Sequence, residues 1–297
     1  MTERATTKLR QMIAGPDLAV LPGVADALNA RLVASEGFDG IYMTGAGTSA
    51  NRLGMPDVGL LTMSEMVDNA GRIADASGLP LLADADTGWG GPLNVRRTVQ
   101  AYERAGVAGI HLEDQEWPKR CGHLAGKAVI SQEDMVAKIK AAVDARKDED
   151  FQIVARSDAL AVEGWNAMLD RAHACEEAGA DVLFLEAMTT MEQLEEAPKL
   201  FEKPLLYNMA SSGKTPFLPT SKIQEMGFGV VIYPNFVVLA AIPAIQRTLR
   251  HLKETGDVAA LANDITSFQE FFDLMGMDEV KELEERYVTD ETRRAGY

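Results

Sequence analysis

The stretch ERAGVAGIHLEDQ, residues 103–115, contains the unit that decides the fold. It runs from the end of an amphipathic segment through Gly106 into the apolar run 109–112, and it continues into the acidic Glu113. Glycine takes the left-handed conformation that ends a helix at little cost, so Gly106 predicts a helix stop directly before a strand. A short apolar run is typical of a strand that is buried on both faces, as in a parallel sheet.

The same unit recurs along most of the chain. Gly37, Gly179 and Gly227 also follow helical patterns and precede apolar runs. We predict eight strands, at residues 19–21, 40–43, 80–84, 109–112, 153–156, 182–185, 205–208 and 230–233. Eight βα units favour an α/β fold of the closed (β/α)₈ type, a TIM barrel. An open, doubly wound sheet is the competing architecture, but no GxGxxG turn follows the first strand.

The domain organisation follows from the same pattern. No linker rich in Pro, Gly or Ser interrupts the 297 residues, so we predict one barrel domain over residues 1–297. A helical pattern at 237–254 follows the last strand, and residues 256–297 continue as an acidic, helical stretch without a strand. We therefore expect a helical C-terminal extension that packs on the barrel or on a neighbouring subunit.

Composition excludes several classes of protein. Lys and Arg number 29 against 45 Asp and Glu, a formal charge of −16, which argues against nucleic-acid binding and against an anionic membrane surface. No apolar run approaches the roughly 20 residues of a membrane span, and residues 1–12 contain no apolar signal core. Two cysteines, Cys121 and Cys175, favour a reducing compartment. We expect a cytoplasmic protein.

Polar groups lie at the ends of five consecutive predicted strands. The active face of a (β/α)₈ barrel is the rim where the strands end. The residues at this rim are Asp84 and Asp86 at the end of the third strand, Glu113 at the end of the fourth, Arg156 at the end of the fifth, Glu186 at the end of the sixth and Asn208 at the end of the seventh. This convergence predicts a functional site at the C-terminal ends of the strands.

The carboxylates among these residues favour a metal site. Asp84, Asp86 and Glu113, together with Asp57 in an earlier loop, could surround one hard cation such as Mg²⁺, which prefers oxygen ligands. The alternative is that Asp84 and Asp86 are turn residues that cap the next helix. Glu113 on the adjacent strand favours the metal.

The arginine and the amide at the rim indicate recognition of carboxylates. The Arg156 guanidinium could bind a substrate carboxylate through two parallel hydrogen bonds, or form a salt bridge with Glu186 or Asp158, and the two roles are compatible. Asn208 could bind a second carboxylate or simply cap its strand. The glycine-rich loop 43–49 could turn backbone N–H groups toward an anion, although a single GxG is weak support.

The loop at residues 116–127, EWPKRCGHLAGK, holds the candidate acid–base group. Cys121 lies among Lys119, Arg120 and His123, and cationic neighbours lower the pKa of a thiol. The loop could close over a ligand as a lid. The alternative, a cysteine buried as a small apolar residue, fits Cys121 poorly because the loop is so polar.

These motifs resemble the isocitrate lyase/phosphoenolpyruvate mutase superfamily over residues 20–251. The resemblance is carried by DADTGWGG at 84–91, EDQEWPKRCGH at 113–123, IVARSDA at 153–159, EA at 186–187 and NMASSGKTP at 208–216. The KRCGH segment is similar to the lyase branch, whose catalytic cysteine corresponds to Cys121. The resemblance implies a (β/α)₈ barrel, Mg²⁺ with Mn²⁺ as the alternative ion, and a homotetramer in which the C-terminal helix is swapped between subunits.

The resemblance also implies a reaction, the cleavage of a 2-hydroxy dicarboxylate to pyruvate and a carboxylic acid. Cys121 would protonate the enolate, and Lys119, Arg120 and His123 would tune the thiol and neutralise developing charge. Glu186 would orient Arg156 or the waters on the metal. The ion would be held by Asp84 and Asp86 directly or through waters, and by Asp57 and Glu113 mostly through water. The implied substrate-binding residues are Thr44, Gly45, Ala46, Gly122, Arg156, Asn208, Ser211, Ser212 and Pro234.

Two departures bear on the substrate. Ala210 and Ser211 replace the threonine–glutamate pair of 2-methylisocitrate lyases, and Asn235 and Phe236 replace a leucine–serine pair. The sequence is more similar to the 2,3-dimethylmalate lyase and petal death protein group, which implies a C3-alkyl malate. A 2-methylisocitrate lyase that forms pyruvate and succinate, and an oxaloacetate hydrolase or decarboxylase, remain alternatives. A phosphonomutase and a non-catalytic barrel are the least favoured.

Overall fold

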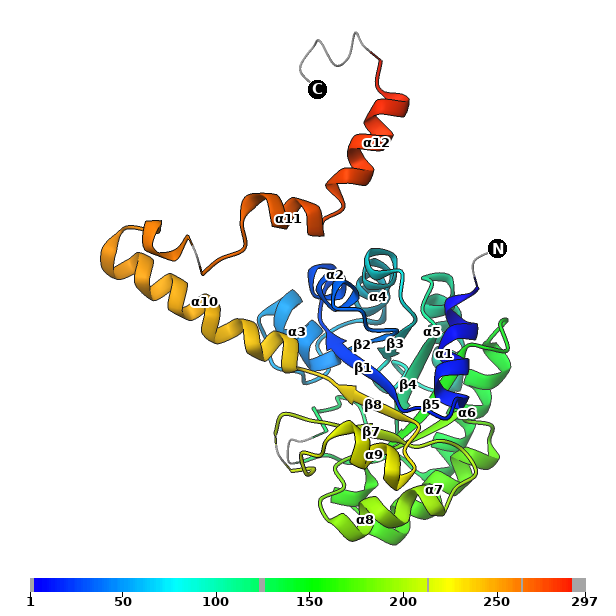
Figure 1. Cartoon of the computed structure of the whole chain (residues 1–297). Helices are drawn as coiled ribbons and strands as arrows, with labels where there is room; N and C mark the ends of the chain where they lie inside the picture. The colour runs from blue at the N-terminus through cyan, green and yellow to red at the C-terminus, as the bar shows by residue number, and fades with distance from the viewer. Residues whose placement is uncertain (1–2, 123–125, 213, 263, 290–297) are drawn as a thin grey trace. The chain divides into compact units, whose positions relative to one another are not determined.

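A computed structural model describes residues 3–122, 126–212, 214–262 and 264–289 (Figure 1). Contacts within the chain divide it into two compact units, Met1–Leu239 and Ala240–Tyr297. The boundary lies inside helix α10 (Phe236–Thr255), ahead of residue 256, where we placed the start of the helical extension.

The first unit is built on eight parallel strands. They are β1 (Ala19–Val24), β2 (Ile41–Met43), β3 (Leu81–Asp84), β4 (Gly109–Glu113), β5 (Gln152–Ser157), β6 (Val182–Leu185), β7 (Leu206–Asn208) and β8 (Val230–Tyr233). Their order in the sheet is β6-β5-β4-β3-β2-β1-β8-β7. A parallel bridge between Leu183 and Leu205 links β6 to the segment before β7 and nearly closes the ring. The predicted (β/α)₈ barrel is confirmed.

The first helix precedes the first strand, and the other helices before α10 lie between successive strands, as Figure 1 shows. They are α1 (Ala5–Ala14), α2 (Ala27–Ser35), α3 (Gly45–Leu53), α4 (Met63–Ser77), α5 (Pro92–Arg104), α6 (Gln132–Ala145), α7 (Trp165–Glu177), α8 (Met191–Glu196) and α9 (Thr220–Met226). The four glycines predicted to end helices all have positive φ, between 78° and 99°. One expectation was wrong: most of the glycine-rich segment 43–49 is not a loop. Helix α3 begins at Gly45, because the Thr44 side chain accepts a hydrogen bond from the Gly47 N–H.

The barrel interior explains how the fold positions the rim. Inward side chains such as Leu21, Tyr42, Leu82 and Val154 form one apolar cluster, which α1 joins through Leu9 and Ile13. Side chains alternate along a strand, so the next inward positions toward the C-terminal ends are the polar ones. Outward side chains of the same strands pack against the helices in a second cluster that includes Ile41, Ile110 and Ile153. Burial on both faces accounts for the continuous apolar runs.

The second unit is helical in its described residues. It contains most of α10, a short 3₁₀ turn (Ala259–Leu261), α11 (Phe268–Leu274) and α12 (Met277–Tyr287). Apolar side chains along α10 are about half exposed, among them Ile242, Ile245, Leu249 and Leu252. Within the described part of the chain, no helix has both the length and the apolar character needed to cross a membrane.

Candidate active site

A pocket of about 110 Å³ opens at the rim where the strands end. Every predicted substrate-binding residue lines it: Thr44, Gly45, Ala46, Gly122, Arg156, Asn208, Ser211, Ser212 and Pro234. Cys121, Asp57, Asp84 and Glu186 line it as well. Residues far apart in the sequence thus share one cavity, and the loop after β4 contributes Cys121 and Gly122 to its wall.

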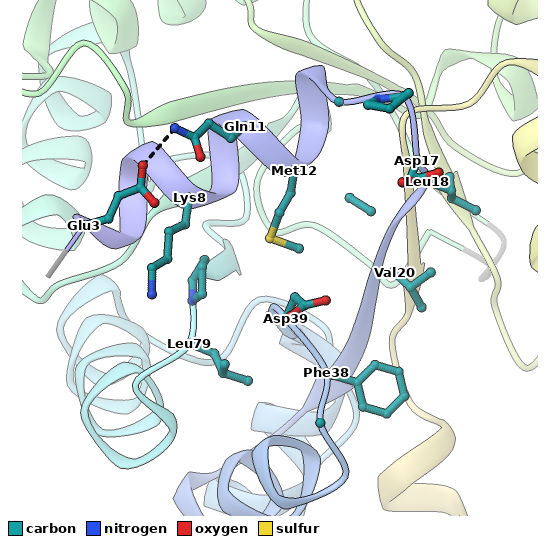
Figure 2. A pocket seen from close by; sticks show the side chains of 15 residues that line it. Glu3, Lys8, Gln11, Met12, Asp17, Leu18, Val20, Phe38, Asp39 and Leu79 are labelled. Atoms are coloured by element: carbon teal, nitrogen blue, oxygen red, sulfur yellow. Dashed lines mark hydrogen bonds between the residues drawn. The ribbon is translucent and has the colours of Figure 1, made fainter.

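A larger cavity of about 690 Å³ lies at the opposite end of the barrel (Figure 2). Its walls come from α1 and from residues that precede β1, β2 and β3, such as Asp17, Asp39 and Leu79. Glu3 and Gln11 form a hydrogen bond of 2.8 Å on one side of it. This cavity is therefore separate from the polar strand ends and from the loop that carries Cys121.

Arg156 occupies the centre of the rim site. In the register of β4 and β5 it lies beside Glu113, and its Nη1 is 3.1 Å from Glu113 Oε2. Its Nε is 3.0 Å from Asp158 Oδ2 and 3.9 Å from Glu186 Oε2, so the predicted ion pairs are present. Burial alone would lower the pKa of Arg156, but these carboxylates outweigh it and raise the pKa well above its usual value. The guanidinium is held as a cation in the pocket wall.

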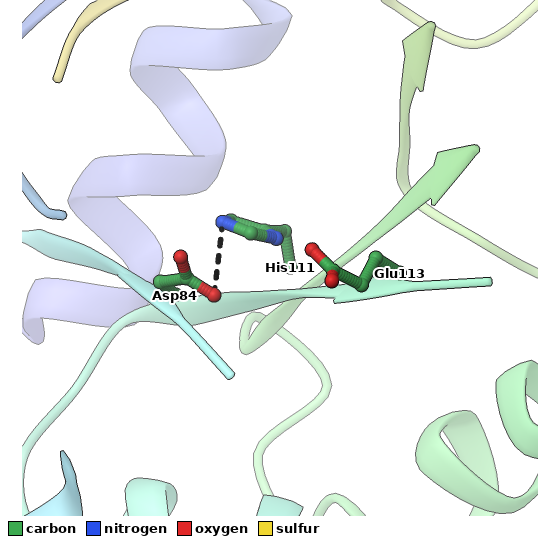
Figure 3. Close-up of side chains that lie close together, drawn as sticks. All are labelled: Asp84, His111 and Glu113. Carbon is green, nitrogen blue, oxygen red and sulfur yellow. Dashed lines mark ion pairs between the residues drawn. The ribbon is translucent and has the colours of Figure 1, made fainter. Parts of the chain in front are cut away.

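Three side chains from β3 and β4 form a compact group beside Arg156. Ligand atoms of Asp84, His111 and Glu113 all lie within 4.8 Å of one another (Figure 3). His111 Nε2 is 3.5 Å from Asp84 Oδ1 and 2.8 Å from the Tyr42 hydroxyl. Burial lowers the pKa of His111 to about 4, so its imidazole is neutral at pH 7.

The group has the chemistry of a divalent-cation site. Glu113 is fully buried, and its Oε1 has no hydrogen-bond partner among the described residues. Burial raises the pKa of Glu113 well above its usual value even though the Arg156 charge opposes this shift, so a bound cation would further favour its charged form. Carboxylate oxygens of Asp84 and Glu113 are ligands that Mg²⁺ prefers. The residues present therefore fit a hard divalent ion.

The other two predicted metal carboxylates contact a lysine. Lys119 Nζ lies 2.6 Å from Asp57 Oδ1 and 2.6 Å from Asp86 Oδ1, and the side chain is 2% exposed. Burial raises the pKa of Asp86 to about 7, even though the Lys119 charge opposes this shift. In this structure Asp57 and Asp86 bind the loop through Lys119, while Asp84 and Glu113 remain the group that fits an ion.

The loop after β4 is held at both ends. The Gln115 side chain donates to the Arg120 carbonyl at 2.8 Å and accepts from the Arg120 N–H at 3.0 Å. Gln115 also pairs with Val129 in an antiparallel bridge. The Cys121 N–H donates to the Asp57 carbonyl at 3.2 Å, which holds the thiol-bearing residue at the pocket. The Arg120 side chain is exposed and does not line the pocket, and His123 lies outside the described residues.

The remaining predicted groups bind one another. Asn208 Nδ2 donates to both carboxylate oxygens of Glu186, at 3.0 and 3.3 Å. The Gly45 N–H, which we expected to face an anion, donates to Asp84 Oδ2 at 3.2 Å. Thr44 donates to Asn235 Oδ1 at 3.0 Å.

The sequence analysis missed three residues that line the pocket, namely Tyr42, Phe184 and Ile232; Ala210 and Asn235, which it singled out only as departures that bear on the substrate, line the pocket as well. It also missed His111, which lies inside an apolar strand and therefore suggests a core residue. The signal that could have found it is its spacing, because His111 and Glu113 are two residues apart and share the inward face of β4.

Comparison with known proteins places this site in a family. The family model described as phosphoenolpyruvate phosphomutase matches residues 9–253. The chain belongs to this family. Among its members, 2,3-dimethylmalate lyase of Eubacterium barkeri is 44% identical over 282 residues, which covers 95% of this chain and 98% of the relative. A 2-methylisocitrate lyase of Aeropyrum pernix is 43% identical over 274 residues, with 92% and 88% covered.

Solved structures of family members have the same fold. A crystal structure of 2,3-dimethylmalate lyase superposes with a TM-score of 0.92 at 40% identity and covers 97% of both chains. A structure of oxaloacetate acetylhydrolase with the inhibitor 3,3-difluorooxalacetate gives a TM-score of 0.90 at 40% identity, covering 95% of this chain and 96% of that one.

Proposed function

We propose that this family member is a Mg²⁺-dependent carbon–carbon lyase that cleaves a 2-hydroxy dicarboxylate of the 2,3-dimethylmalate type into pyruvate and a carboxylic acid. The observation that carries the proposal is that one small pocket joins Cys121, Arg156 and the Asp84 carboxylate, with Glu113 in contact with Arg156. The 44% identity to a 2,3-dimethylmalate lyase supports the same reaction.

Asp84 and Glu113 would hold the ion, and the neutral His111 lies beside them. Asp57 and Asp86 form ion pairs with Lys119. Mn²⁺ is the alternative ion, since it takes the same oxygen ligands. When bound, the ion would lower the pKa of the substrate 2-hydroxyl and orient it.

The side chains supply the remaining steps. The Arg156 guanidinium, fixed by Glu113 and Asp158, would bind the carboxylate next to the hydroxyl. Loss of the hydroxyl proton turns the C2–O bond into a carbonyl, and the C2–C3 electron pair passes to C3 as a carboxylate-stabilised enolate. Cys121 would then give its thiol proton to C3 and complete the acid product.

Pocket size and lining favour a small substrate. The volume of about 110 Å³ is modest, and Phe184, Ala210 and Ile232 form part of its wall. A C3-methyl group suits such apolar contacts. A tricarboxylate such as 2-methylisocitrate would need a further polar partner where Ala210 lies. Oxaloacetate hydrolysis is the second candidate function, because an oxaloacetate acetylhydrolase shares the fold at 40% identity.

A substrate panel tests the proposal. We expect pyruvate from 2,3-dimethylmalate with Mg²⁺, and at most slow release from 2-methylisocitrate. Pyruvate from 2-methylisocitrate alone would show that Ala210 does not exclude the larger substrate. Conversion of oxaloacetate to oxalate and acetate, without any pyruvate from the malates, would replace the lyase with the hydrolase.

We also propose the assembly that the resemblance implies, a homotetramer with a swapped C-terminal helix. An apolar groove of about 560 Å³ lies between α2 and the start of α10, lined by Val20, Leu32, Val33, Phe38 and Phe236 among others. Helix α10 itself presents half-exposed Ile245 and Leu249. An apolar helix from a second copy would cover such a groove. The cytoplasmic location stays a prediction.

A further inference from the structure

A second buried lysine lies at the end of the loop after β4. The Lys127 side chain is 3% exposed, and its Nζ lies 2.8 Å from Asp158 Oδ1. The same ammonium donates a hydrogen bond to the Gly122 carbonyl, five residues earlier in the loop. Lys127 therefore contacts the loop and the residue that directly follows strand β5 at the same time.

The partner of Lys127 is itself fixed. Asp158 is fully buried and its N–H donates to Asp114 Oδ1 at 2.8 Å. Its second oxygen, Oδ2, is 3.0 Å from Arg156 Nε. One carboxylate thus lies between the Lys127 ammonium and the guanidinium that we expect to bind substrate.

Gly122 completes the arrangement. A Cβ added there would overlap the Arg156 guanidinium and lie 2.8 Å from Cγ of Glu186. The backbone that follows Cys121 is therefore packed directly on Arg156, and the hydrogen bond from Lys127 holds its carbonyl in this place. Two fixed acceptors hold the buried ammonium in place, because breaking either hydrogen bond would leave a buried polar group without a partner.

We propose that Lys127 is a positioning residue for the reaction: its bonds to Asp158 and to the Gly122 carbonyl hold the Cys121–Gly122 turn against Arg156. The predicted effect of Lys127 on turnover rests on the proposed function. The predicted effect on the loop does not, so an experiment can contradict one prediction without contradicting the other.

Thiol labelling tests the loop without any substrate. Burial raises the pKa of Cys175 to about 12 and the residue is 4% exposed, so iodoacetamide labelling of the folded protein reports on Cys121. We expect Lys127→Met to increase the labelling rate by about tenfold, which corresponds to the stabilisation lost with a charge-assisted hydrogen bond. Lys140→Met, which removes an exposed lysine of α6, is the matched control and leaves the rate unchanged.

Turnover provides the second readout. Lys127→Met should lower kcat by about a hundredfold, the effect of a misplaced catalytic group, while KM changes less than about threefold because Arg156 remains. Lys127→Arg should restore part of kcat and slow the labelling again. If Lys127→Met does not fold, Lys127→Gln replaces it, because it removes the charge and its shorter side chain does not reach both Asp158 and the Gly122 carbonyl.

Labelling decides the outcome. Wild-type labelling rates in the folded Lys127→Met or Lys127→Gln protein would overturn the proposal, whatever the activity. Faster labelling together with a wild-type protein that cleaves no malate would support the loop contact and reject the lyase.

Discussion

Cys121 is the residue on which the proposed chemistry depends. It lines the pocket, and its backbone is tied to Asp57. We predict that Cys121→Ser lowers kcat by about 10²–10⁴, the usual contribution of a general acid, while KM changes little, because the proton is needed only in the transition state. Pyruvate release under saturating substrate measures this. Cys175→Ser, on the buried face of α7, is the control and should keep kcat; equal turnover in both variants would remove Cys121 as the acid.

Gly122 is predicted to tolerate no side chain. A Cβ would meet the Arg156 guanidinium and the Glu186 side chain, neither of which has room to move in a buried network. We expect Gly122→Ala to reduce kcat/KM by about a hundredfold or more with a folded protein by circular dichroism. Gly71→Ala, in helix α4 where the nearest atom to the added Cβ is 3.5 Å away, should behave as wild type. Full activity of Gly122→Ala would mean that the loop does not pack on Arg156 in solution.

The location of the polar side chains at the strand ends was predictable, because side chains alternate along a strand and the C-terminal ends of all strands meet at one rim of the barrel. This is how Arg156, Asn208 and the carboxylates were placed at one site. The partners of each charge were not predictable. Lys119 contacts both Asp57 and Asp86. These three residues lie in separate loops, and only the folded conformation of the loops brings them together. His111 was interpreted as a core residue, because within an apolar strand the sequence pattern of a buried structural histidine is the same as that of a functional one.

At the scale of elements, one buried carboxylate links a strand to its neighbours. Asp114 Oδ2 accepts from Ser157 Oγ of β5 at 2.7 Å and lies 3.4 Å from Arg171 Nη1 of α7. We predict that Asp114→Ala destabilises the protein by about 3–5 kcal/mol, because removing one partner leaves buried polar groups unpaired. Urea unfolding measures this. Glu163→Ala, which removes the more exposed partner of the same arginine, is expected to cost about 1 kcal/mol or less. Equal losses would contradict a special role for Asp114.

The strands and most helices followed from local rules, since glycine caps and short apolar runs mark each βα unit. Helix α3 did not, because GAGTS composition predicts a loop and only the Thr44 cap starts a helix there. The division of the chain within α10 was also beyond local rules. A helical pattern continues through residue 239, and only tertiary contacts separate the two units.

At the scale of the whole molecule, α10 should decide the assembly. Its Ile245 and Leu249 side chains are 56% and 58% exposed, which is unusual for an apolar face in water. We predict that the wild type is a tetramer by size-exclusion chromatography with light scattering, and that Ile245→Glu with Leu249→Glu yields smaller species. Gln246→Glu, an exposed polar position on the same helix, is the control and should leave the mass unchanged. A monomeric wild type would contradict the swapped-helix assembly.

The most direct test of the central claim follows the bond that breaks and the proton that replaces it. The enzyme is incubated with 2,3-dimethylmalate in D₂O, with Mg²⁺ or with excess EDTA, and the products are analysed by NMR. We expect equal amounts of pyruvate and propanoate, with one deuterium at C2 of the propanoate, in the Mg²⁺ sample and no products in the EDTA sample. Intact 2,3-dimethylmalate in both samples, or cleavage that resists EDTA, would contradict the account.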